Sequence, residues 1–276
     1  MRLLACLLVV LVVALPAAAG DGPVSSLDRG YHLMYGLDFL SADREFVQWE
    51  REHPRDARGR ASVAANLLFA ELDRAGILQA QFFTDDSSFT SRKMLPANPA
   101  LRARFDAALA NAETQARAQL KADPRDRDAL FALTMVYGLR ADYAALIEGR
   151  NMTSLSYTRQ GAGWARQLLA LSPDYADAYL ATGMSEYIVG SLAAPVRWLL
   201  RIAGYTGDKA TGMQQLRLTA AHGRLLGPLA RILLAIAYLR DHDAARAREL
   251  LVALAGDFPS NPLFAREIQR LDRRGD

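Results

Sequence analysis

Residues 228–261 read PLARILLAIAYLRDHDAARARELLVALAGDFPSN, and this stretch decides the fold class. Apolar and small residues recur three or four positions apart on both sides of a short polar turn, which is the spacing of helices with one buried face. The recurring positions are Leu234, Ala235, Tyr238, Ala247, Leu251 and Leu254. The stretch therefore predicts two helices joined by a tight turn and closed by Pro259.

The same order of helix, polar turn with proline and new helix start recurs at Pro54, Pro124 and Pro173. Small residues let two helices approach closely and large ones fill the gap to the next pair, as in tetratricopeptide repeats (TPR). The prolines are not separated by the ~34 residues of a regular repeat. We therefore predict an all-α, TPR-like helical-hairpin solenoid with padded, irregular repeats over 28–273, of which 228–261 is the most regular.

Helix-start signals such as Asn98-Pro99 and Asn261-Pro262 divide the chain into about twelve helices. A polar run makes the stretch near 82–98 the only long irregular one. The expected ranges are 28–39, 42–53, 57–76, 99–122, 126–149, 154–171, 174–190, 194–203, 208–222, 228–240, 243–257 and 262–273.

The N-terminal residues 1–19 have the features of a secretory signal peptide: Arg2, an apolar run over 3–15, and a small-residue cleavage site ending at Ala19. The run spans about 20 Å as a helix, less than the ~30 Å hydrocarbon core, so a retained anchor is the weaker alternative. Cleavage after Ala19 would also remove the lone cysteine, Cys6. We expect cleavage, a flexible 20–27, and export to the periplasm or the extracellular space.

A family resemblance rests on Gly204-Tyr-Thr-Gly-Asp-Lys-Ala-Thr-Gly212, Ala220-Ala-His-Gly223, Ala230 to Leu239 and Phe258-Pro-Ser-Asn-Pro-Leu-Phe264. These segments resemble exported bacterial TPR proteins of uncharacterised function. More distantly, they are similar to the eukaryotic TPR family that includes the mitochondrial inclusion-body clearance protein. The resemblance covers about 28–270 and implies an all-helical fold and, at most, an adaptor role. Asp128 and Ala132 stand where chaperone-binding TPRs carry Lys and Asn, so the resemblance does not include a carboxylate clamp.

No catalytic, cofactor-binding or metal-binding residues emerge from the sequence. The four histidines form no metal-binding pair, and there is no phosphate loop or nucleophile elbow. A net charge of +3, with 30 of the 33 basic residues arginine and scattered, does not indicate nucleic-acid binding. We expect no enzyme and no cofactor.

The first of two candidate binding surfaces is the inward face of the first helix of each pair. In TPR solenoids such faces line a concave groove that accepts a peptide, whereas padded helices bury the same residues as core. The candidate groove residues are Phe131, Met135, Leu180, Met184, Tyr187, Ile232 and Ile236.

The second surface is the amphipathic segment 194–204, in which Arg197 and Arg201 lie four positions apart and Trp198 lies on another side. It is either an interfacial helix for an anionic membrane or partner, or a helix packed between repeats whose arginines extend to solvent. We prefer packing, because ten residues give little membrane affinity.

The sequence thus predicts a non-enzymatic exported scaffold or adaptor for a protein or peptide partner. The alternative is a peripheral membrane or envelope-organising protein that uses the 194–204 helix.

Overall fold

The structure is a computed structural model that describes residues 24–78 and 96–275. These residues form twelve α-helices and one short 3-10 helix, and no strand, which confirms the all-α class. The signal peptide predicted at 1–19 and most of the irregular stretch expected at 82–98 lie outside the described residues. The helices are α1 (Ser26–Tyr35), α2 (Phe39–Glu52), α3 (Ala57–Arg74), α6 (Pro99–Ala122), α7 (Arg127–Leu146), α8 (Asn151–Leu171), η1 (Ala176–Ala178), α9 (Tyr179–Gly190), α10 (Ala194–Ile202), α11 (Lys209–His222), α12 (Gly227–Arg240), α13 (Ala244–Asp257) and α14 (Pro262–Gly275).

Side-chain caps fix where most of these helices begin. At α6 the Asn98 side chain accepts hydrogen bonds from the backbone N–H groups of Ala100 at 2.9 Å and Leu101 at 3.3 Å. The Ser25 side chain caps α1, and Leu27 is buried, so the expected flexible stretch 20–27 is wrong for its last residues. The other boundaries lie within a few residues of the expected ones.

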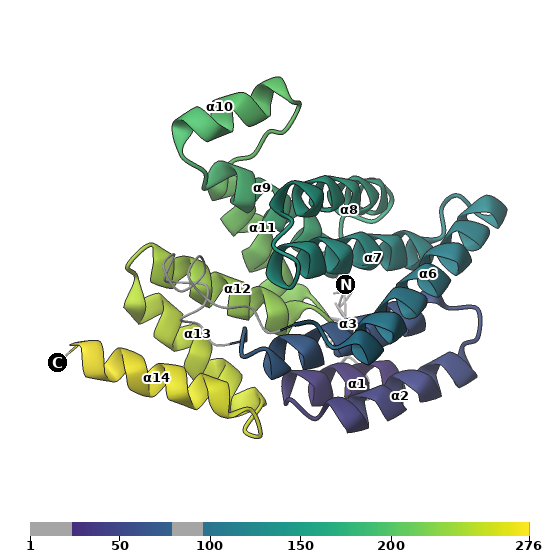
Figure 1. The fold of residues 1–276 in the computed structure, drawn as a ribbon, viewed down its shortest axis with the longest axis horizontal. Helices are drawn as coiled ribbons and strands as arrows, with labels where there is room; N and C mark the ends of the chain where they lie inside the picture. Colours follow the sequence, from purple (N-terminus) through teal and green to yellow (C-terminus); the bar gives the residue numbers. More distant parts are fainter. Residues whose placement is uncertain (1–23, 79–95, 276) are drawn as a thin grey trace, which may run out of the picture.

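Apart from α9 and α10, each helix packs on the next one in the chain, and α9 packs on α11, so the body is a succession of helical hairpins (Figure 1). Second-neighbour packing of α3 on α7 ties two hairpins together. Helix α7 therefore has α3, α6 and α8 around it, and it is buried on nearly all sides over 129–137.

The first and last parts of the body meet. The Tyr35 hydroxyl at the end of α1 donates to the carbonyl oxygen of Leu225, before α12, at 3.0 Å. The Asn261 side chain, between α13 and α14, donates to the carbonyl oxygen of Tyr35 at 2.9 Å, and Ser260 donates to that of Gly36 at 3.1 Å. The row of hairpins thus closes on itself.

Two apolar clusters hold the body together. The main core runs from α1 to α8 and joins the C-terminal helices through residues such as Phe258 and Phe264. A second core, centred on Met213, Leu216 and Leu234, lies between α9, α11 and α12. Helix α10 contributes to neither core.

Candidate functional site

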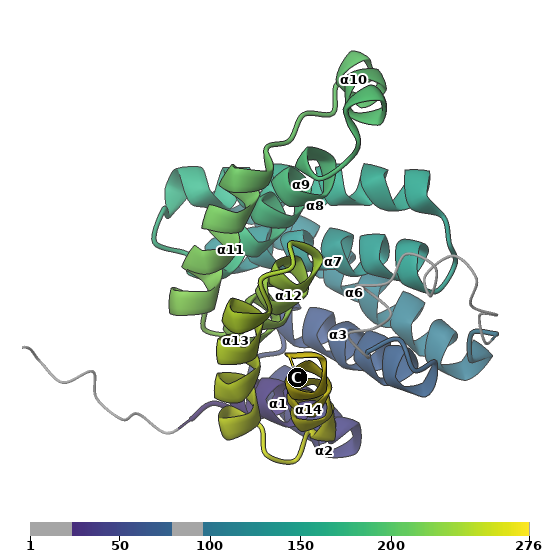
Figure 2. The ribbon, with the colours of Figure 1, turned by 90° about the vertical axis from the view of Figure 1, so that its left-hand side faces the viewer.

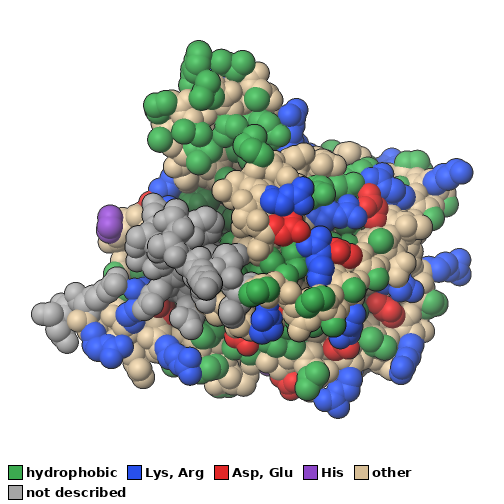
Figure 3. Space-filling view, viewed as in Figure 1, with side chains coloured by type: hydrophobic (Ala, Val, Ile, Leu, Met, Phe, Trp, Pro, Cys, Tyr) green, Lys and Arg blue, Asp and Glu red, His purple; other side chains and the backbone are tan. Residues whose placement is uncertain are grey.

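Helix α10 projects from the body and contains no buried residue. In two perpendicular views it stands apart from the other helices, beyond the ends of α9 and α11 (Figures 1 and 2). Trp198, Leu199 and Ile202 are 62%, 61% and 68% exposed, and Val196 is also exposed. Apolar side chains gather on this projection (Figure 3). We call Val196, Trp198, Leu199 and Ile202 the α10 apolar surface.

The preferred prediction for this segment, a helix packed between repeats, is wrong. The arginines do reach solvent, but so do the large apolar side chains. Only Leu200 of the helix is half-buried. Large apolar side chains that face water forgo the free energy that burial would give. Four of them occur together on the nine-residue helix α10, whereas exposed apolar residues on an ordinary protein surface are scattered singly.

Local sequence signals give α10 defined ends without help from burial. Pro195 occupies the first turn, where its fixed φ suits a helix and its missing N–H removes no bond. At the other end, Gly204 has a φ of 80°, a left-handed conformation that glycine adopts without strain. The N–H of Tyr205 donates to the carbonyl oxygen of Leu200 at 2.9 Å, and the N–H of Gly204 donates to the carbonyl oxygen of Arg201 at 3.0 Å. These two hydrogen bonds form a Schellman motif.

Polar contacts anchor the base of this projection to the body. The N–H of Asp208, where α11 begins, donates to the Glu186 carboxylate of α9 at 2.8 Å. Arg197 donates to the carbonyl of Gly190, at the end of α9, at 3.1 Å. On the far side, the guanidinium of Arg159 in α8 lies 5.1 Å from the ring centre of Tyr205. These contacts hold α10 outward.

The charge on α10 itself has one sign, and the nearest acids in sequence, Glu186 and Asp208, lie at the base of the projection. Residues 187–207 contain Arg197 and Arg201 and no Asp or Glu. Both arginines are exposed, and within the described part of the chain neither forms an ion pair. At 100° per residue, two positions four apart lie on one side of a helix, so the guanidinium groups border the α10 apolar surface along one edge.

Two of the candidate groove residues are core residues. Phe131 is fully buried and packs near Tyr175, with ring centres 5.0 Å apart. Met135 is buried, and its sulfur accepts a hydrogen bond from the Tyr31 hydroxyl at 3.8 Å. The expectation that these two face a groove is wrong, because α3, α6 and α8 surround α7.

The other five candidate groove residues are half-buried. Leu180, Met184 and Tyr187 of α9 pack against the second core, and Ile232 of α12 packs against the main core. Each leaves part of its side chain accessible. Whether a peptide binds these side chains stays a prediction.

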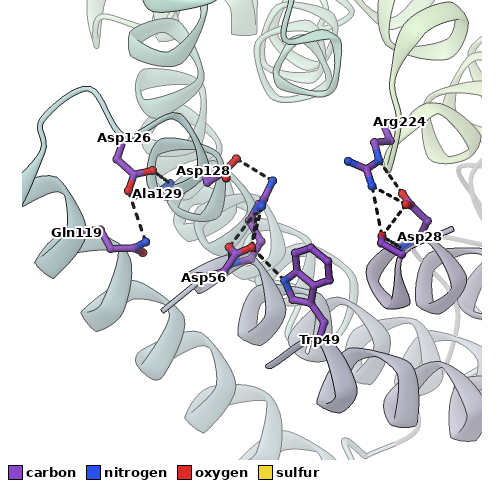
Figure 4. Close-up of polar contacts among 10 residues, drawn as sticks. Asp28, Trp49, Asp56, Gln119, Asp126, Asp128, Ala129 and Arg224 are labelled. Atoms are coloured by element: carbon purple, nitrogen blue, oxygen red, sulfur yellow. Dashed lines mark hydrogen bonds and ion pairs between the residues drawn. The ribbon is translucent and has the colours of Figure 1, made fainter. Parts of the chain in front are cut away.

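Polar residues that were not among the predicted site residues form a bridge between α3 and α7. The Arg58 guanidinium donates to Asp56 at 2.7 Å and pairs with Asp128 at 2.7 Å, so both carboxylates converge on it (Figure 4). The Trp49 indole N–H also donates to Asp56, at 3.0 Å. Burial alone would lower the pKa of Arg58, but the hydrogen bonds and charges of these carboxylates raise it. Arg58 therefore stays charged and holds three helices together.

Asp177 makes a second polar bridge. Its buried carboxylate accepts hydrogen bonds from the backbone N–H groups of Arg224 and Leu225, each at 3.2 Å, and of Leu226 at 2.9 Å. Burial raises the pKa of Asp177, and these three donors oppose the rise. No residue pattern in the sequence points to this contact, since its partners lie almost fifty positions away.

A pocket of about 750 Å³ lies beside the base of the projection, between α11 and α12. Arg197, Lys209, Arg217, Tyr238 and Arg246 are among its lining residues, together with three aspartates. Lys209 pairs with Asp241, Arg246 with Asp243 at 3.3 Å, and Arg217 donates to the Tyr238 hydroxyl at 3.2 Å. Two of its four cations, Lys209 and Arg246, are thus neutralised by aspartates, while Arg217 bonds to a neutral hydroxyl.

Within the described ranges, no group of three or more His, Cys, Asp or Glu side chains is arranged to hold a metal ion. In the same residues, every helix is too short or too polar to cross a bilayer. No protein-family model matches the chain, and no curated protein matches it as a recognisable relative.

Proposed function

We propose that this protein is a non-enzymatic, exported scaffold that attaches to its partner through α10. The observation that carries the proposal is the exposure of Trp198, Leu199 and Ile202 on a helix without a buried residue. A contiguous apolar surface on an otherwise closed body is typical of an interaction site. The helical body then serves to hold α10 in a fixed position.

The proposed architecture is TPR-like, with padded repeats. Its support is the succession of packed hairpins and the pair α12 and α13, which coincides with the regular repeat at 228–261. The proposed location is the periplasm or the extracellular space, on the strength of the signal-peptide pattern at 1–19.

A non-enzymatic role agrees with the polar bridges. The carboxylate of Asp177 is surrounded by backbone donors, and the Arg58 guanidinium by two carboxylates. Their hydrogen-bonding capacity is used to connect helices.

Site-directed photocrosslinking in the cells that produce the protein tests the proposal. A photoreactive phenylalanine analogue replaces Trp198 in one variant and Leu40, which is 79% exposed on α2, in a matched control. We expect adducts, to lipid or to protein, from position 198 and none from position 40. Equal labelling at both positions would contradict an attachment role for α10.

A second candidate function is the capture of a peptide by the half-buried residues Leu180, Met184 and Tyr187, together with Ile232 and Ile236. The observation in its favour is that all five side chains are half-buried, and four of them pack against the second core or the main core. A photoreactive group at Tyr187 that labels a protein partner would favour it, and a group that labels nothing would count against it.

A further inference from the structure

We propose that the partner of α10 is an anionic lipid surface, and this inference rests on the proposed function of α10 as the attachment element. The α10 apolar surface enters the boundary between headgroups and acyl chains, and Arg197 and Arg201 pair with lipid phosphates. The assignment follows from shape, from side-chain type and from charge.

The shape argument concerns how far α10 stands from the body. Helix α10 lies at the tip of a projection (Figure 1), and apolar side chains gather there (Figure 3). Its exposed apolar side chains are Val196, Trp198, Leu199 and Ile202. A flat lipid surface reaches such a tip without contacting the rest of the body. The ordered ends of α10 mean that the helix is already formed when it meets the surface, so no folding entropy opposes binding.

The side chains are those that an interfacial helix uses. Trp198 has an apolar ring with one N–H donor, and tryptophan prefers the boundary between water and acyl chains. Leu199 and Ile202 supply apolar area beside it, each more than half exposed.

Charge complementarity selects an anionic surface. Residues 187–207 carry two arginines and no acid, and the flanking acids Glu186 and Asp208 lie at the base of the projection, away from its tip. Arg201 makes no ion pair within the described residues, and Arg197 contacts only a backbone carbonyl there. The Arg201 guanidinium is therefore available for bidentate binding to phosphate oxygens, and Arg197 keeps the donors that its one hydrogen bond to that carbonyl does not use.

The expected binding is reversible. A nine-residue helix has a small apolar area, so attachment depends on lipid charge and weakens with salt. Each arginine near an anionic surface contributes about fivefold to binding. The loss of both is expected to weaken partitioning about 30-fold.

Vesicle flotation tests the inference with the chain from Gly20 onward, which retains every described residue. The probes are vesicles of phosphatidylcholine mixed with phosphatidylglycerol, and vesicles of phosphatidylcholine alone. We expect the protein to float with the mixed vesicles and not with the neutral ones. Trp198→Asp is expected to remove flotation, and Arg197→Gln with Arg201→Gln to reduce it about 30-fold.

Leu40→Asp is the matched control, because it places the same charge at an exposed apolar position on the body. It is expected to float like the unchanged chain. Trp198→Asp, Arg201→Gln and Leu40→Asp replace exposed side chains, so these variants should keep the unfolding transition of the unchanged chain, which circular dichroism checks. Because Arg197→Gln also removes the hydrogen bond to Gly190, Arg201→Gln alone, expected to bind about fivefold more weakly, tests the charge without changing how α10 is anchored.

Failure of the unchanged chain to float with mixed vesicles would overturn the lipid assignment. Equal flotation with neutral vesicles, or flotation that Trp198→Asp leaves intact, would also overturn it. If position 198 still crosslinks to a protein in cells, the attachment role of α10 stands and only the lipid assignment is lost. If neither vesicles nor crosslinks respond to position 198, both proposals are wrong.

Discussion

Arg224, between α11 and α12, joins this segment to α1 through a bidentate ion pair with Asp28. Its Nε donates to Oδ1 at 2.7 Å and its Nη2 to Oδ2 at 2.5 Å, across 196 positions of sequence. Arg224 lies next to Leu225, whose carbonyl accepts the Tyr35 hydroxyl. The pair therefore strengthens the closure between α1 and the start of α12 (Figure 4).

The first prediction concerns this closure. Arg224→Gln is expected to lower the free energy of unfolding by about 0.5–1 kcal/mol, since the pair is partly solvent-screened but links distant segments. Urea denaturation measures the loss. Arg248→Gln is the control, because its pair with Asp272 at 2.8 Å joins only α13 and α14 and is exposed. If Arg248→Gln lowers the free energy of unfolding as much as Arg224→Gln does, joining α1 to the segment before α12 adds nothing to stability.

The second prediction concerns acid stability. Burial alone would raise the pKa of Glu113, but hydrogen bonds from Arg117, Arg140 and Tyr137 lower it below its usual 4.5. A carboxyl with a lowered pKa stabilises the folded state above its unfolded pKa and loses that contribution as the pH falls through the folded value. Stability should therefore fall below about pH 4.5.

Urea titrations near neutral pH and well below about pH 4 compare the unchanged chain with Glu113→Gln. The variant should show a smaller decrease in the free energy of unfolding over this range. Glu249→Gln, at an exposed position of α13, should keep the decrease of the unchanged chain. The prediction fails if both variants behave alike.

The third prediction concerns the buried carboxylate of Asp177. Asp177→Ala leaves three backbone N–H groups without their acceptor, and we expect a loss of about 2–3 kcal/mol in thermal or urea unfolding. Asp177→Asn keeps the Oδ1 acceptor for Leu225 and Leu226, so its loss should be smaller. Asp174→Ala, in the exposed turn nearby, should change stability by less than about 0.5 kcal/mol. Equal losses for Asp177→Ala and Asp177→Asn would refute this ordering.

The fourth prediction concerns the close crossing of α9 and α11. A methyl group on Gly212 would lie 2.5 Å from the backbone nitrogen of Tyr187 and 2.8 Å from the carbonyl oxygen of Gly183. Because backbone atoms cannot move aside cheaply, Gly212→Ala should cost about 2–3 kcal/mol. In α8, a methyl group on Gly163 would meet nothing within 4 Å, so Gly163→Ala should stabilise by about 0.5–1 kcal/mol. Differential scanning calorimetry should show a lower unfolding temperature for Gly212→Ala and a higher one for Gly163→Ala.

Local features of the fold follow from the sequence. Asn98 caps α6 as its position before Pro99 predicts, and Asn261 caps α14 in the same way, accepting from the Leu263 N–H at 2.9 Å. These contacts act over two or three residues, so short patterns are enough to find them. The second role of Asn261, as donor to Tyr35, depends on a partner 226 positions away and has no local signal.

The spacing of apolar residues could not predict whether α10 and the candidate groove residues are buried or exposed. Apolar spacing identifies a helix with an apolar face, but the same pattern suits a packed helix and a projecting one. Trp198 and Phe131 differ in burial because their helices have different neighbours. Other helices enclose α7, whereas contacts at Gly190 and Asp208 direct α10 outward. Tertiary contacts thus make Phe131 a core residue and leave Trp198 exposed.

The contact of Asn261 with Tyr35 has a consequence for how the protein unfolds. An open row of helical hairpins has two terminal units with one neighbour each, and unfolding begins at such ends. Here the end of α1 contacts Leu225 and Asn261, so the N-terminal end is not a weak starting point, whereas α14 packs mainly on α13. We therefore expect α1 to unfold together with the body, and α14 to be the terminal helix that is lost first. Hydrogen exchange should show α1 protected as strongly as α7, the most enclosed helix of the body.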